Sequence, residues 1–179
     1  MAFTAPGLTA EAANEVTGTL QERLSALNDL HLTLKHIHWN VVGPNFIGVH
    51  EMIDPQVELV RGYADTLAER IATLGGSPRG TAKAIEADRS WDDYSVDRDT
   101  VLAHLGALDL VYDGIITSHR AAIEKVGKVD PVTEDILIGQ TAELEKFQWF
   151  VRAHLENQTG DLSNQGAASE EDAAAKSRG

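Results

Sequence analysis

Four long blocks of the chain carry apolar residues at helical spacing, and turn-rich segments separate them. In the first block, leucines recur every three or four residues, as one face of an amphipathic helix requires. Each block would form roughly 40 Å of helix at about 1.5 Å per residue. The blocks are residues 9–40, 46–74, 95–126 and 131–157, with Thr9 as the expected N-cap of the first.

Four helices of matched length predict an all-α fold, a four-helix bundle. The connection between the second and third helices is too long for a tight turn, and residues 81–88 within it are expected to form a short extra helix. The positions expected in the bundle core include Leu105, Leu108, Val111, Ile115, Leu144, Phe147 and Val151.

The chain divides by composition into one domain and a tail. A chain of 179 residues with 42% apolar side chains is long enough for one sizeable core. We therefore predict a four-helix-bundle domain over residues 1–157. Residues 158–179 contain almost no large apolar side chain, so we expect a mobile polar tail there.

Charge and residue usage narrow the classes of function. The formal net charge is −13, which repels phosphate backbones and attracts cations. Cysteine is absent, so a metal would be bound by His, Asp or Glu. No stretch approaches the length of a membrane span, and the N-terminus does not resemble a secretory signal, so a cytoplasmic protein without membrane contact is expected.

The second helical block carries a stripe of potential metal ligands. At about 100° per residue, Asp54, Asp65 and Glu69 lie roughly 40°, 60° and 100° around the helix from His50. A mixture of imidazole and carboxylate suits a borderline transition metal such as Fe(II), whereas an all-oxygen site would favour calcium or magnesium.

The distances between these residues along the helix axis show how they could form a metal site. Asp54 and Asp65 are separated by roughly 16 Å along the helix, while bonds from such ligands to metals span only about 2 Å. If two copies pack antiparallel about a two-fold axis, His50 and Asp54 of one copy face Asp65 and Glu69 of the other. His38, at the end of the first block, would complete the His-rich half.

An ordinary interpretation of the same residues stays open. Taken singly, Asp65 and Glu69 are typical of a solvated helix face, and His50 of a surface or capped histidine. Trp39 is more typical of a core position than of a redox partner. The remaining histidines lack supporting neighbours and are read as surface or core-edge residues: His31, His36, His104, His119 and His154.

Three motifs bring a family resemblance. The patterns His-Trp-Asn, Asn-Phe-x-x-x-His-Glu and Asp-x-x-Ala-Glu-Arg, within residues 24–154, resemble the Dps family, also called DNA-binding proteins from starved cells or mini-ferritins. The likeness to actinobacterial members is closest over residues 31–65. It implies a ferritin-like bundle that assembles as a hollow homo-dodecamer.

The resemblance also implies an activity and a set of ligands. The family's ferroxidase centre lies at a two-fold interface and oxidises Fe(II), preferably with hydrogen peroxide or else with dioxygen, before ferric oxide-hydroxide mineral is stored in the cage. Trp39 is implied beside the centre, and an iron-uptake pore is implied near Asp135, Asp130 and Glu134. The implied ligands, which are also the catalytic residues, are His38, His50, Asp54, Asp65 and Glu69.

Two rival functions stay open. A nucleoid-associated, DNA-compacting protein with a vestigial ferroxidase centre would need basic termini, but the first 22 residues contain no Lys or Arg, and Lys176 and Arg178 of the tail lie among acids. A di-metal enzyme acting on an organic substrate would need its ligands inside one bundle. Ordinary ferritins use Glu-x-x-His there, and no Glu in this sequence has His three residues later.

Overall fold

Four long helices form the body of the protein, and capping residues set their ends. In the computed structural model, which describes residues 5–178, these helices are α1 (Ala10–Asn40), α2 (Phe46–Thr73), α4 (Val101–Val126) and α5 (Pro131–Leu155). The Thr9 side chain accepts a hydrogen bond from the Ala12 amide, which confirms Thr9 as the N-cap of α1. The four-helix prediction is confirmed, although residues 1–4 of the expected domain and residue 179 of the expected tail lie outside the described residues.

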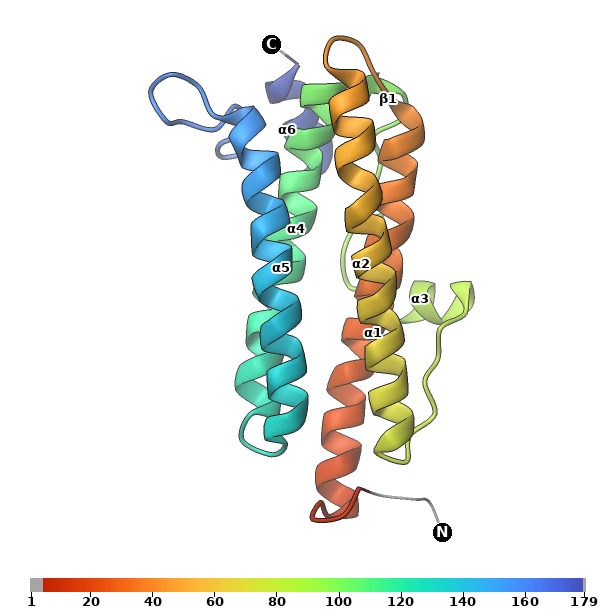
Figure 1. Cartoon of the computed structure of the whole chain (residues 1–179). Helices are drawn as coiled ribbons and strands as arrows, with labels where there is room; N and C mark the ends of the chain where they lie inside the picture. The colour runs from red at the N-terminus through yellow and green to blue at the C-terminus, as the bar shows by residue number, and fades with distance from the viewer. Residues whose placement is uncertain (1–4, 179) are drawn as a thin grey trace.

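The helices pack as two antiparallel pairs, α1 with α2 and α4 with α5 (Figure 1). Their apolar faces meet in one continuous core that runs the length of the bundle. Five of the seven expected core positions are buried, whereas Val111 and Ile115 are only partly buried at its edge.

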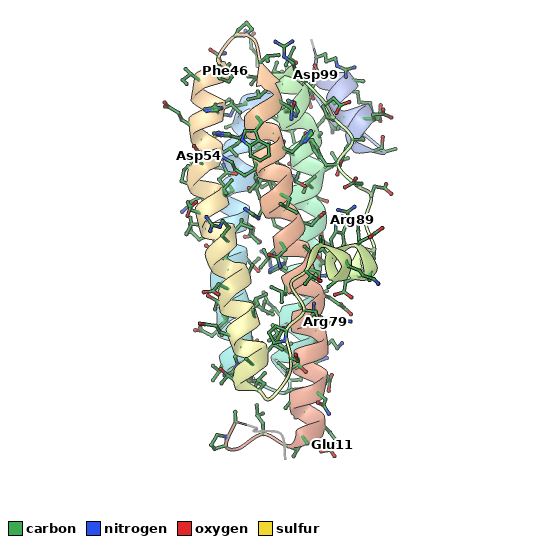
Figure 2. The ribbon with its side chains drawn as sticks, turned by 90° about the vertical axis from the view of Figure 1, so that its right-hand side faces the viewer. Glu11, Phe46, Asp54, Arg79, Arg89 and Asp99 are labelled. Atoms are coloured by element: carbon green, nitrogen blue, oxygen red, sulfur yellow. The ribbon has the colours of Figure 1, made fainter. Side chains whose placement is uncertain are left out.

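The connection between α2 and α4 crosses the bundle. It contains the short helix α3 (Ala82–Asp88), at the position expected from the sequence, and then runs along α1 from Arg89 to Asp99 (Figure 2). There β2 (Asp99–Thr100) pairs in parallel with β1 (Val41–Val42). Because this pairing keeps residues 99–100 extended and Thr100 caps the helix, α4 begins at Val101, six residues later than the predicted Ser95.

Helix α4 is long and apolar enough to cross a membrane, by length and composition alone. The expectation that no stretch approaches this length was therefore wrong. Helix α4 nevertheless packs against α1, α5 and α6, and more than half of its apolar stretch is buried inside the protein. This is the environment of a core helix, for which the same composition is usual.

The C-terminal segment differs from the mobile polar tail expected from its composition. Helix α6 (Glu170–Ser177) packs on α4, with Ala173 and Ala174 buried. At Gly106 the absence of a side chain lets Ser177 and the Ala173 carbonyl approach the α4 backbone closely. Small residues thus provide contact area that a search for large apolar side chains overlooks.

Polar groups fix the start of this segment on the bundle. The Asn164 side chain is buried and donates hydrogen bonds to the Gly106 carbonyl (3.1 Å) and to Asp109 Oδ2 (2.9 Å). At the far end, Arg178 forms an ion pair with Asp99 at 2.6 Å. These contacts offset the conformational entropy that the segment loses when it becomes ordered, although it has few large apolar side chains.

Two histidines also lie elsewhere than expected. His104 and His119, read as surface or core-edge residues, are completely buried on α4. Burial lowers the pKa of His119 to about 4, with a further contribution from Arg23. His104 accepts or donates a 2.9 Å hydrogen bond with the Tyr94 hydroxyl, and burial lowers its pKa as well. Both rings are therefore uncharged at neutral pH.

Candidate metal centre

His38 and His50 meet where α1 turns into α2. The connection is only five residues long and reverses direction through Gly43 and Asn45, whose φ angles are 93° and 63°. The two imidazole rings stack with their centroids 3.6 Å apart and an interplanar angle of 22°. A short turn between two long helices thus places both rings side by side.

Each of these rings is oriented by the backbone of the other residue. His38 Nδ1 lies 3.0 Å from the His50 carbonyl oxygen, and His50 Nδ1 lies 2.9 Å from the His38 carbonyl oxygen. A carbonyl only accepts, so a neutral ring in this position donates from Nδ1 and keeps its lone pair on Nε2. This is the usual arrangement for a metal-binding histidine, whose second nitrogen is held by a backbone or carboxylate oxygen.

Asp54 lies beside the histidine pair, one turn further along α2. Its Oδ1 is 3.2 Å from His38 Nδ1 and 3.1 Å from Lys35 Nζ, while about half of the side chain is exposed. The hydrogen bond from Lys35 is the main reason that the pKa of Asp54 is lowered. Asp54 is therefore an anionic oxygen donor in contact with the His38 ring of the stacked pair.

Asp65 and Glu69 are exposed on α2, and they do not join the histidine cluster within one chain. Across the described residues 5–178, no group of three or more His, Asp and Glu side chains is arranged to hold a metal ion. A single chain therefore presents two separated sets of donor residues.

A groove along the outer face of α1 and α2 connects Asp54 with Asp65. It consists of two hollows of about 510 and 630 Å³ that share His31, Glu58 and Arg61 in their walls. Asp54 lines the first hollow and Asp65 lines the second. Figure 2 shows Asp54 on this side of α2, below Phe46 at the helix start.

Trp39 does not occupy a core position in the isolated chain. Its side chain is 72% exposed, and Lys35 Nζ lies 5.8 Å from the centre of its ring. Phe46 and Ile47, at the start of α2, are exposed as well. The interpretation of Trp39 as a core residue is therefore wrong for one chain, and an exposed aromatic surface borders the histidine pair.

The three acids expected at a pore have different environments. Asp130 is buried, caps α5 through the Val132 amide, and pairs with Arg70 and Thr133. Glu134 is partly buried with its carboxylate against Gly127, whereas Asp135 is exposed. In this chain Asp130 is thus engaged in holding the start of α5, which leaves Asp135 as the accessible carboxylate.

The basic partners of two of the predicted site residues, Asp54 and Asp130, were missed in the sequence. Lys35 bonds Asp54 and Arg70 pairs with Asp130, across 19 and 60 residues of chain. Each contact joins two different helices, so no spacing along one helix indicates it.

The chain is similar to known proteins both in sequence and in fold. Residues 18–159 match the ferritin-like domain family. The "DNA protection during starvation protein" of Mycolicibacterium smegmatis is 66% identical over 176 residues, covering 98% of this chain and 96% of the relative. Among solved structures, Mycobacterium smegmatis Dps has a TM-score of 0.93 at 66% identity, covering 94% of this chain and 96% of that one. DpsA14 from Streptomyces coelicolor has a TM-score of 0.88 at 63% identity, covering 89% and 95%.

Proposed function

We propose that this chain, which belongs to the Dps family of ferritin-like proteins, oxidises Fe(II) at centres shared between two subunits and stores the ferric product in a hollow homo-dodecamer. The observation that carries the proposal is the reciprocal bonding of His38 and His50, because it directs both Nε2 lone pairs away from the backbone. Such a pair beside the Asp54 carboxylate is a ready half-site for Fe(II).

The second half of the site comes from a second copy of the chain. Asp65 lies in the groove wall 11 residues beyond Asp54, and Glu69 follows one turn later on α2. An antiparallel two-fold packing of the α1–α2 faces brings these carboxylates of one copy opposite the histidines of the other, and it produces two equivalent sites per dimer. The exposed side chains of Trp39, Phe46 and Ile47 would be covered by this packing.

The donor set suits the chemistry of iron oxidation. Two Fe(II) ions and one hydrogen peroxide, with two waters, give two FeOOH units and four protons, so the reaction releases acid. The carboxylates of Asp54, Asp65 and Glu69 favour the more highly charged ferric state, while the neutral imidazoles bind Fe(II). Dioxygen is the slower alternative oxidant in this proposal.

Iron supply and storage depend on the negative surface. The net charge of −13 raises the local concentration of cations around the assembly. We assign the lining of the uptake pore to Asp135, because Asp130 is buried with Arg70. An uptake role for Asp135 rests on its exposure and its position at the start of α5.

Contacts in the C-terminal segment disfavour the alternative role as a DNA-compacting protein. Lys176 pairs with Asp172 at 3.1 Å, and Arg178 pairs with Asp99, so both cations of the segment are engaged within the chain. Affinity for duplex DNA grows with the number of phosphates that free cations neutralise. We infer that any protection of DNA acts by consuming Fe(II) and peroxide together.

A complementation experiment tests the shared site. One variant carries His38→Ala and His50→Ala, the other carries Asp65→Ala and Glu69→Ala, and each alone is expected to oxidise Fe(II) slowly. A mixed dimer of the two contains one site with all four replacements and one intact site. Anaerobic loading with Fe(II), followed by hydrogen peroxide, should therefore show about half of the wild-type rate per mixed dimer.

Controls separate this result from a loss of assembly. A chain with Asp113→Ala and Glu51→Ala removes two exposed acids and should oxidise iron like the wild type. Size-exclusion chromatography should give one assembly size for all variants. Full activity in either parent variant, or no recovery in mixed dimers that assemble, would refute the shared site.

A further inference from the structure

A second cavity lies on the opposite side of α1 from the α1–α2 groove, between α1, α4, the segment after α3 and the start of α6. Its volume is about 270 Å³, and it is more enclosed than the two hollows that make up the groove. Ligand pockets typically measure about 300–1,000 Å³, and this cavity lies just below that range, so it has room only for a small molecule. Its walls do not include any of the proposed iron ligands.

One end of the cavity holds a buried cation without an anionic partner. Arg23 on α1 is only 7% exposed, and within residues 5–178 it forms no ion pair with a carboxylate. Its one side-chain hydrogen bond goes from Nη1 to the Ser118 hydroxyl of α4. Burial lowers the pKa of Arg23, and the negative charge of Glu22 opposes this effect only in part.

The buried guanidinium of Arg23 would be stabilised by an anion. Arginine is almost never fully buried unless it is paired, because its remaining N–H donors lose their hydration. His119 beside it is neutral and buried, and the exposed Glu22 acts on Arg23 only through its charge, without forming an ion pair. The planar guanidinium bonds a carboxylate through two parallel hydrogen bonds better than it bonds a spherical ion.

The rest of the cavity is mainly apolar. Leu30, Val111 and Ile115 form its walls, and Trp91 closes the side of the α2–α4 connection. The carboxylate of Asp29, also in the wall, is already neutralised by Arg89 and by a 2.6 Å hydrogen bond from Trp91 Nε1. Glu170 of α6 contributes a buried Oε2 without a hydrogen-bond partner, and burial with nearby Asp92 raises its pKa to about 7.

We propose that this cavity binds a small organic monocarboxylate, with its carboxylate paired to Arg23 and Ser118 and its apolar body between Leu30, Ile115 and Trp91. A dianion such as phosphate fits less well, because most of the wall offers no hydrogen-bond donors. The bound molecule would touch α1, α4 and α6 together, so its binding links the C-terminal helix to the bundle.

Calorimetric titration with benzoate at constant ionic strength tests the proposal. The wild-type assembly should bind one benzoate per chain, and Arg23→Gln should weaken binding by about tenfold or more, as expected for loss of a charged hydrogen-bond partner. Gly114→Leu is a second variant, because Gly114 lines the cavity and an added Cβ there meets no atom within 4 Å. It should block binding by filling the space.

Two further experiments test where benzoate binds and whether its negative charge is required. A crystal soaked with 4-bromobenzoate should show the anomalous bromine signal in this cavity, and Arg120→Gln, an exposed arginine paired with Glu145, should bind benzoate like the wild type. The neutral analogue benzyl alcohol should bind at least about tenfold more weakly. Absence of benzoate binding, equal binding by Arg23→Gln, equal binding of benzyl alcohol, or bromine elsewhere would each overturn the proposal.

Discussion

His38 and His50 orient each other, since the Nδ1 of each ring bonds the backbone carbonyl of the other at 3.0 and 2.9 Å. This relationship fixes the tautomer and the direction of two rings through one five-residue turn. Both rings therefore depend on the same backbone, and the proposed half-site needs no rearrangement of these rings to bind a metal.

Replacing His50 should remove one proposed iron ligand and release the His38 ring. Because loss of a group that merely orients a metal ligand costs about 10–100-fold in metal affinity or activity, we expect His50→Ala to slow peroxide-driven Fe(II) oxidation by at least about tenfold. Stopped-flow absorbance of the ferric product measures the rate. His154→Ala serves as the control, since His154 is exposed at the end of α5, and equal rates in both variants would contradict the assignment.

Lys35 should compete with Fe(II) for Asp54. Lys35→Met removes the hydrogen bond that lowers the pKa of Asp54, so this pKa rises toward its ordinary value of about 3.9. Asp54 stays ionised at neutral pH, and an adjacent positive charge is lost, so Fe(II) binding should tighten several-fold there. The gain should shrink as the pH falls toward about 4, where Asp54 takes up a proton. Anaerobic calorimetry at both pH values measures this, and weaker binding at neutral pH would show that Lys35 supports the site.

Gly106 should control the docking of the C-terminal segment. In Gly106→Ala the new methyl group overlaps Ser177 and the Ala173 carbonyl, so α6 should detach and proteolysis after Asn157 should accelerate. Gly139→Ala is the matched control on α5, since its Cβ meets no atom within 4 Å. Both glycine-to-alanine changes increase helix propensity by about 1 kcal/mol. A difference in proteolysis rate between the two variants therefore reports on the contact between Gly106 and α6. Equal proteolysis would mean that α6 accommodates the methyl group.

Asp130 should matter for stability more than its neighbour Asp135. Asp130→Ala removes the N-cap of α5 and leaves Arg70 without its partner, so we expect a loss of about 2–4 kcal/mol in unfolding free energy. Asp135→Ala should stay within about 0.5 kcal/mol, because its side chain is exposed, yet it should slow iron uptake. Chemical denaturation and uptake kinetics of both variants measure this. Unchanged uptake in Asp135→Ala would refute its role in the pore.

Glu170 should make stability fall as the pH rises. Its pKa is raised to about 7, mainly by burial and then by Asp92, with Asp29 and Asp93 adding smaller effects that the Ser95 amide opposes. An acid whose pKa is higher in the folded than in the unfolded chain destabilises the fold on ionisation, so stability is lost between about pH 4.3 and pH 7.

Glu170→Gln should therefore raise the melting temperature above that of the wild type at pH 8 but not at pH 4. Glu171→Gln, on the exposed side of α6, is the control and should show no such difference. A melting-temperature gain that is the same at both pH values would contradict ionisation of Glu170 as the cause.

The sequence alone determined the helices and the chemistry of the donor residues. Leucines at helical spacing place one apolar face on each block, and that periodicity depends only on the geometry of one helix. The same local geometry places His50, Asp54, Asp65 and Glu69 on one stripe of α2. The proposal that they bind iron adds a second subunit, which the geometry of one helix does not supply.

Only the tertiary structure decided which polar groups are buried and which partners they have. Asp130 and Asp135 both appear as acids at a helix start, yet one is buried against Arg70 of α2 and the other is exposed. Likewise Trp39 is exposed, His119 is buried, and α6 docks through Ala173 against Gly106. These outcomes depend on contacts between segments far apart in the chain. The free energy of such contacts comes from packing and desolvation, which the residue types of one segment do not specify.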